Sequence, residues 1–207
     1  MTNKLKLIWN IDKFRLVYHG IEIAVSHSKL VPFAVGAIVE EQDTDRVLGE
    51  FSVMNDPGDK PGWYLANKLE SEPQKKTGSV VIQGQHPVTL QAIVHDLNED
   101  PSWRGEWIEQ ALDNIFRLTN EKKITAIQIP ALGNVRGHYG LQEFIVSFIE
   151  RLDTFIANET LQLDPVRSKH IEAQGSVNIP LNKIWLLADV DHCKKLFSIL
   201  EETISAL

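Results

Sequence analysis

The spacing of apolar residues changes once between residues 124 and 156, and this change predicts a strand followed by a helix. Residues 124–129 form a short, isoleucine-rich run that has the length of a buried strand and is too short for a helix. Pro130 ends that run. A glycine-rich loop would then lead into an amphipathic helix. The apolar residues on one face of that helix are Leu141, Phe144, Ile145, Phe148, Ile149, Leu152, Phe155 and Ile156.

Similar patterns predict further elements along the chain. One amphipathic helix should begin near Ser102, its expected N-cap, and a closing helix should follow an acidic cap at residues 189–191. Residues 89–130 would form a right-handed βαβ crossover with parallel strands. Strands are expected at residues 4–9, 21–25, 78–83, 89–95 and 183–188.

Three regions give weaker patterns. Residues 33–40 and 46–54 surround an acidic turn and fit either a β-hairpin or a short helix after Gly36. The hairpin is favoured because valine, isoleucine and phenylalanine dominate the region. Residues 55–69 predict a surface loop and then a short helix. Residues 158–182 show no sustained period, so we expect an elaborated loop there.

Composition and charge narrow the functional classes. A chain of 207 residues is most simply one α/β domain with elaborations, and two small domains would also fit its length. Its formal charge of −7 argues against general binding to nucleic acid, although a local basic pocket could hold one small anion. No stretch approaches the roughly 20 apolar residues of a membrane span, and we expect a cytoplasmic protein.

The lone cysteine and the seven histidines give no metal-binding pattern. Cys193 cannot form an intramolecular disulfide, and it falls on an apolar helical position, which favours a core residue. The histidines are scattered, and none forms an i, i+4 pair with a carboxylate between them. We therefore expect neither a metal nor a cofactor. The sequence predicts neither an oligomeric state nor a protein partner.

The loop after Pro130 has the composition of an anion site. Gly133, Gly137 and Gly140 would let the backbone turn sharply and approach a ligand without a Cβ in the way. Backbone N–H groups in such a loop lie beside the positive end of the helix dipole, where phosphate binds well. Alternatively, the connection needs glycine only for its own geometry, as strand-to-helix connections in α/β proteins often do.

The run AIQIPALGNVRGHYG (residues 126–140) resembles the diphosphate-binding loop of macro domains, in which a glycine-rich turn wraps the diphosphate of ADP-ribose. GSVVIQG, AIVHD and IWLLADVDHCKKLFSIL resemble later macro-domain strands and the closing helix, so the match covers residues 77–207, while the first third matches weakly. The resemblance implies a single domain with a three-layer α/β/α fold and a mixed, largely parallel sheet. Asn134, Val135 and Arg136 replace the family's usual Thr-Gly pair.

The resemblance also implies which residues would meet a ligand. Backbone amides of residues 132–137 would hold the phosphates, and Arg136 would add charge if its side chain turns inward. Residues 26–28 follow an early strand, where the family carries an Asn-Ala-Ala-Asn stretch, and would meet the distal ribose. His27 replaces the family's second asparagine and is the one candidate catalytic residue, as a general base. The candidates are Ser26, His27, Ser28, Leu132, Gly133, Asn134, Val135, Arg136 and Gly137.

His95 ends a buried apolar run and has two interpretations. It could face a ligand at the sheet edge, or it could be a core histidine whose ring nitrogens bond neighbouring backbone groups.

The leading function implied by the resemblance is binding of ADP-ribose or a related nucleotide diphosphate. One alternative is a non-catalytic structural module with a degenerate pocket, and another is a hydrolase of ADP-ribosyl esters or phosphates. An open cleft lined by the loop amides would favour a binder, and a filled one would favour the module.

Overall fold

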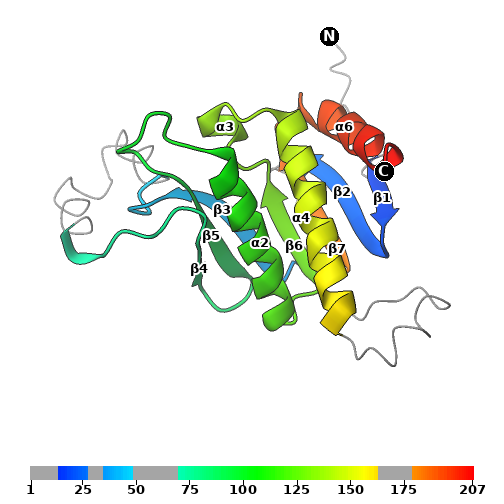
Figure 1. The fold of residues 1–207 in the computed structure, drawn as a ribbon, viewed down its shortest axis with the longest axis horizontal. Coiled ribbons are helices and arrows are strands. Elements are labelled where there is room, and N and C mark those ends of the chain that lie inside the picture. Colours follow the sequence, from blue (N-terminus) through cyan, green and yellow to red (C-terminus); the bar gives the residue numbers. More distant parts are fainter. Residues whose placement is uncertain (1–13, 28–34, 49–69, 163–178) are drawn as a thin grey trace, which may run out of the picture.

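The computed structural model describes residues 14–27, 35–48, 70–162 and 179–207. The predicted strand at 4–9, the elements predicted at 55–69 and Ser28 lie outside these ranges. The described strands form one seven-stranded sheet in the order β1-β2-β7-β6-β3-β5-β4 (Figure 1). They are β1 (Arg15–Tyr18), β2 (Ile21–His27), β3 (Ala37–Asp43), β4 (Val80–Gln83), β5 (Val88–His95), β6 (Ala126–Pro130) and β7 (Lys183–Ala188).

The central strands of this sheet are parallel. β2 pairs with β7, β7 with β6, β6 with β3 and β3 with β5, each in the parallel sense. The edge strands β1 and β4 are antiparallel to their neighbours β2 and β5. Parallel strands point the same way, so the carboxyl ends of β3, β6 and β7 meet at one edge of the sheet. The predicted α/β class with a mixed, largely parallel sheet is confirmed.

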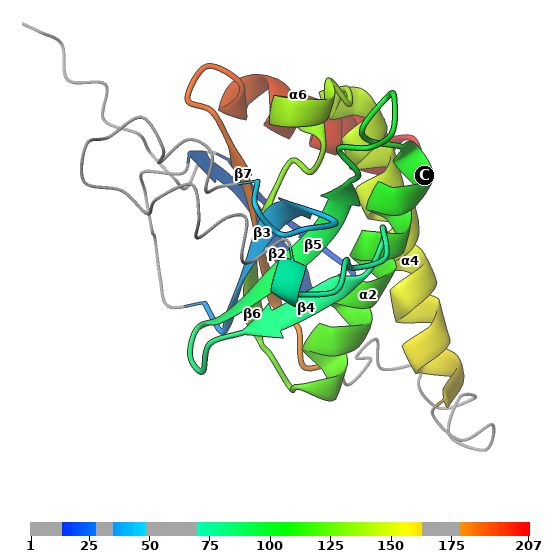
Figure 2. The ribbon, with the colours of Figure 1, turned by 90° about the vertical axis from the view of Figure 1, so that its left-hand side faces the viewer.

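The longer helices pack side by side against the sheet (Figure 2). They are α2 (Gly105–Glu121), α4 (Leu141–Gln162) and α6 (Cys193–Ser205), and a short helix α3 (Asn134–Gly137) lies between β6 and α4. Side chains alternate along the buried strands, so that Ile127 and Ile129 join the core under the helices, whereas Ala126 joins a smaller cluster with Trp185. The apolar face of α4 fills the centre of the main core.

The pairing of β3 differs from the predicted one. Residues 33–40 were expected to pair with residues 46–54 in a hairpin, but β3 lies between β6 and β5 and is parallel to both. Residues 49–54, most of the predicted second strand, lie outside the described ranges. Glu41, Gln42 and Asp43, assigned to the turn, belong to the carboxyl end of the strand. Gln42 and Asp43 accept hydrogen bonds from the residues that follow the strand: Gln42 Oε1 accepts the N–H of Leu48 at 3.2 Å, and Asp43 Oδ1 accepts the N–H of Asp45 at 2.8 Å.

The helix boundaries also differ from the predicted ones. α2 begins at Gly105 with Arg104 as N-cap, and the main-chain carbonyl of Ser102 accepts the N–H of Asp96 in the connection before the helix. α6 has His192 as N-cap, and Asp189 contributes only its carbonyl, which accepts the N–H groups of His192 and Cys193. Both predicted caps were wrong. α4 extends to Gln162, so part of the predicted loop at 158–182 is helical.

Candidate functional site

A cavity of about 500 Å³ opens where β3, β6 and β7 end, and we call it the carboxyl-edge cavity. Open α/β sheets bind ligands in the crevice outside the carboxyl ends of their strands. Among the described residues, the cavity is lined by Val39, Glu40, Glu41, Gln42, Leu48, Pro130, Ala131, Asn134, Arg136, Leu187, Ala188 and Asp189.

The loop from β6 to α4 forms one wall of this cavity. Gly133 has the left-handed backbone conformation (φ 73°) and precedes α3, so the predicted order of strand, loop and helix holds with a short helix inserted. The N–H of Ala131 donates to the carbonyl of Leu187 (3.2 Å), which joins the loop to β7. Asn134 Nδ2 donates to the carbonyl of Tyr139 (2.8 Å), which closes the turn.

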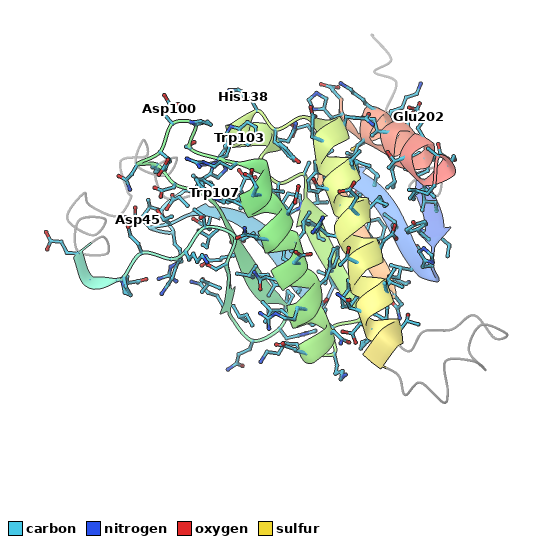
Figure 3. The ribbon with its side chains drawn as sticks, viewed as in Figure 1. Asp45, Asp100, Trp103, Trp107, His138 and Glu202 are labelled. Carbon is cyan, nitrogen blue, oxygen red and sulfur yellow. The ribbon has the colours of Figure 1, made fainter. Side chains whose placement is uncertain are left out.

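Packing within the protein explains two loop glycines. A Cβ on Gly133 would lie 2.6 Å from Ile108 Cδ1 on α2, and a Cβ on Gly137 would lie 2.6 Å from the Trp103 ring. Trp103 and His138 lie at the end of the molecule where α2 begins and α3 lies (Figure 3). Because glycine has no Cβ, these two positions leave room for the side chains of Ile108 and Trp103. This observation favours the alternative in which the connection needs glycine for its own geometry.

Several of the predicted phosphate donors already have acceptors in the protein. The N–H of Gly133 donates to Glu41 Oε2 at 2.8 Å. The N–H of Asn134 donates to the carbonyl of Ala131 (3.1 Å), and the N–H of Gly137 to the carbonyl of Gly133 (3.0 Å). A phosphate at this loop would have to displace these acceptors or use the other amides.

Glu41 also contacts His95, so one carboxylate joins the loop to β5. Glu41 Oε1 lies 2.5 Å from His95 Nε2, and the two side chains are 13% and 1% exposed. An ionised carboxylate can only accept, so Nε2 carries the hydrogen of this bond. His95 is thus buried, as the core interpretation required, but its partner is a side chain. Sequence analysis missed Glu41, which local spacing does not distinguish from its polar neighbours.

The charged groups that line the cavity are mostly acidic. Glu40, Glu41 and Asp189 contribute carboxylates, and Arg136 is the cation among the described lining residues. Arg136 is largely exposed, and its Nη1 donates to the carbonyl of Leu48 at the cavity wall. An anionic ligand would therefore meet one guanidinium among several carboxylates.

The other predicted residues lie on β2, in the loop after β6 and in α3. Ser26 is buried, with its hydroxyl donating to the carbonyl of His27 (3.3 Å). His27 ends β2 in register with Ala188, which lines the cavity, but neither Ser26 nor His27 is among the described lining residues. Leu132 is fully buried. The backbone of Val135 lies in α3.

The described residues contain neither a metal-binding cluster nor a membrane-spanning helix. No group of three or more His, Cys, Asp or Glu side chains there could hold a metal ion. Nor does that part of the chain contain a helix long and apolar enough to cross a membrane.

No family model and no curated protein sequence matches the chain, but solved structures do. The Oceanobacillus iheyensis macrodomain with ADP matches with a TM-score of 0.57 at 16% identity, over 93% of this chain and 95% of that one. The Trypanosoma brucei macrodomain in complex with ADP-ribose matches with a TM-score of 0.53 at 14% identity, over 88% and 68%. The macro domain of ganglioside induced differentiation associated protein 2 matches with a TM-score of 0.53 at 10% identity, over 86% and 81%. The chain therefore has the macrodomain fold, as the sequence predicted.

Proposed function

We propose that the chain binds ADP-ribose or a related nucleotide diphosphate in the carboxyl-edge cavity. The observation that carries this proposal is the cavity itself, which is bordered by the loop whose sequence resembles a diphosphate-binding loop. Its volume of about 500 Å³ falls within the roughly 300–1,000 Å³ usual for small-molecule sites. Structures with the same fold hold ADP and ADP-ribose, which supports this ligand class.

The lining residues offer complementary surfaces for such a ligand. Asn134 and Arg136 offer an amide and a guanidinium to the phosphates. The carboxylate of Asp189 can accept hydrogen bonds from ribose hydroxyls. Aliphatic surface for a base and a ribose comes from Val39, Leu48, Pro130, Ala131, Leu187 and Ala188.

Calorimetric titration with ADP-ribose, ADP, NAD and inorganic phosphate tests the proposal. Arg136→Ala should weaken ADP-ribose binding roughly tenfold, because one charge-assisted hydrogen bond is lost. Arg117→Ala removes an exposed arginine outside the cavity and should leave the affinity unchanged. ADP-ribose at a hundred times its Kd should stabilise the fold by about 2.7 kcal/mol. No binding of any nucleotide up to millimolar concentration would contradict the proposal.

A second candidate is a non-catalytic module that keeps the fold and has a degenerate pocket. The specific observation in its favour is the bond from Gly133 to Glu41, which occupies a donor that a phosphate would need. The same titration separates the two candidates, since the module binds no nucleotide.

For the third alternative, hydrolysis of ADP-ribosyl bonds, we propose that turnover is weak or absent. His27 is the candidate base, but it is not among the described residues that line the cavity.

A further inference from the structure

We propose that Glu41 sets the ligand specificity of the carboxyl-edge cavity. Its carboxylate accepts the hydrogen bond of the Gly133 N–H, which is the backbone donor that an anionic ligand group would use. The inference rests on the proposed function for the identity of the ligand. The contact itself is a hydrogen bond within the protein and does not depend on which ligand binds.

The Glu41 carboxylate is held from two sides. Oε2 accepts the N–H of Gly133 at 2.8 Å, and Oε1 accepts from His95 Nε2 at 2.5 Å. The side chain is 13% exposed and lines the cavity. β3 and the loop are far apart in sequence, and this carboxylate links them directly. Glu41 therefore holds a fixed negative charge at the donor that was predicted for the ligand.

A phosphate that reaches Gly133 must displace this carboxylate or lie beside it. Two negative charges at such short range repel, and a partly buried site screens that repulsion less than water does. Displacement would also leave the buried His95 without its acceptor, which is unfavourable. The native cavity should therefore disfavour phosphate at Gly133. It should favour a ligand group that donates a hydrogen bond to the Glu41 carboxylate, such as a ribose hydroxyl or a base amino group.

Removal of the carboxylate should expose two donors at once. In Glu41→Ala the Gly133 N–H and the His95 Nε2–H would both face the vacated space, where one anion could accept from each. Glu41→Gln keeps the shape of the side chain and removes its charge, so it should give a smaller effect. Glu40→Gln removes a carboxylate from the same cavity that has no bond to the loop among the described contacts, and it is the matched control.

The experiment measures the affinity of the parent and the three variants for inorganic pyrophosphate and for ADP-ribose by calorimetry. We expect Glu41→Ala to bind pyrophosphate at least tenfold more tightly than the parent, Glu41→Gln to show a smaller gain, and Glu40→Gln to stay within about twofold. Circular dichroism checks folding. If Glu41→Ala does not fold, the comparison of Glu41→Gln with Glu40→Gln decides.

Other results overturn the inference. The inference is wrong if neither Glu41 variant binds pyrophosphate more tightly than the parent. It is also wrong if Glu40→Gln gains as much affinity as the Glu41 variants, because the gain would then reflect the total charge of the cavity. A parent that binds no nucleotide, with a Glu41→Ala variant that binds pyrophosphate, supports the inference and contradicts the proposed function. A parent that binds ADP-ribose, with Glu41 variants that show no gain, supports the proposed function and overturns the inference.

Discussion

Glu41 follows another glutamate and precedes Gln42 and Asp43, and nothing in this local sequence marks its side chain as largely buried. Such a polar run is typical of a turn. Its partners, Gly133 and His95, lie 92 and 54 positions away in the chain. Local spacing carries no information on contacts at that separation. The sequence could therefore identify the loop at Gly133 but not the carboxylate that faces it.

Cys193 is the opposite case, because its own position in a helical pattern predicted a core residue. The side chain is fully buried, and its Sγ donates to the carbonyl of Asp189 at 3.3 Å. Burial, with a smaller contribution from the charge of Asp189, raises the pKa of the thiol from 9.0 to about 11.

This raised pKa predicts a loss of stability at alkaline pH. Between pH 9 and 11 the unfolded chain loses the thiol proton and the folded chain keeps it, so the folded state binds more protons and its stability falls as pH rises. The loss should approach roughly 2–3 kcal/mol near pH 11. Urea unfolding of the parent and of Cys193→Ala at several pH values between 8 and 11 measures it. The variant should lack this part of the pH dependence, and identical slopes for both proteins would contradict the assignment.

At the scale of elements, the change of hydrophobic period between residues 126 and 156 was enough to predict the strand, the loop and the helix. It was not enough to tell what the loop glycines face. Gly133 and Gly137 contact Ile108 and Trp103, which belong to α2 and to the connection before it. The glycines that indicated a phosphate site are thus also required by packing against a neighbouring element.

Gly133→Ala tests how much of the loop's stability depends on this packing. The left-handed backbone should cost about 1–2 kcal/mol for a residue with a Cβ, and the contact with Ile108 should add about 1–3 kcal/mol of overpacking. Chemical denaturation should therefore show a loss of roughly 2–5 kcal/mol.

Gly20→Ala is the control for that experiment. Gly20 also has a positive φ, but a Cβ there would meet nothing within 4 Å, so only the backbone term applies. Equal losses for the two variants would show that Ile108 adds nothing. A truncated Ile108 in the Gly133→Ala background should recover part of the loss if the contact is the cause.

At the scale of the whole molecule, the sheet order decides which strand ends share the cavity. The sequence predicted β6 and β7 with close bounds, and the resemblance supplied a parallel sheet. The place of β3 beside β6 depends on pairing between distant segments, which the local hairpin pattern could not predict. As a result β3 lines the cavity without having been predicted to do so, and β2, which carries His27, lies one strand beyond β7.

That placement leads to the last prediction, which is weak or absent hydrolysis. His27 pairs with Ala188 at the end of β2 and is half-buried, so a ligand in the cavity would lie against β7 before it reached the imidazole. A general base alone contributes about 10²–10⁴-fold, and most of the rate of a hydrolase comes from a positioned nucleophile and an oriented substrate.

The assay follows release of ADP-ribose from a mono-ADP-ribosylated protein and from O-acetyl-ADP-ribose by the parent and by His27→Ala. His192→Ala, which removes an exposed histidine whose side chain makes no capping bond, is the control. We expect little turnover by any of the three. Robust turnover by the parent and by His192→Ala that collapses in His27→Ala would make His27 catalytic and the protein a hydrolase.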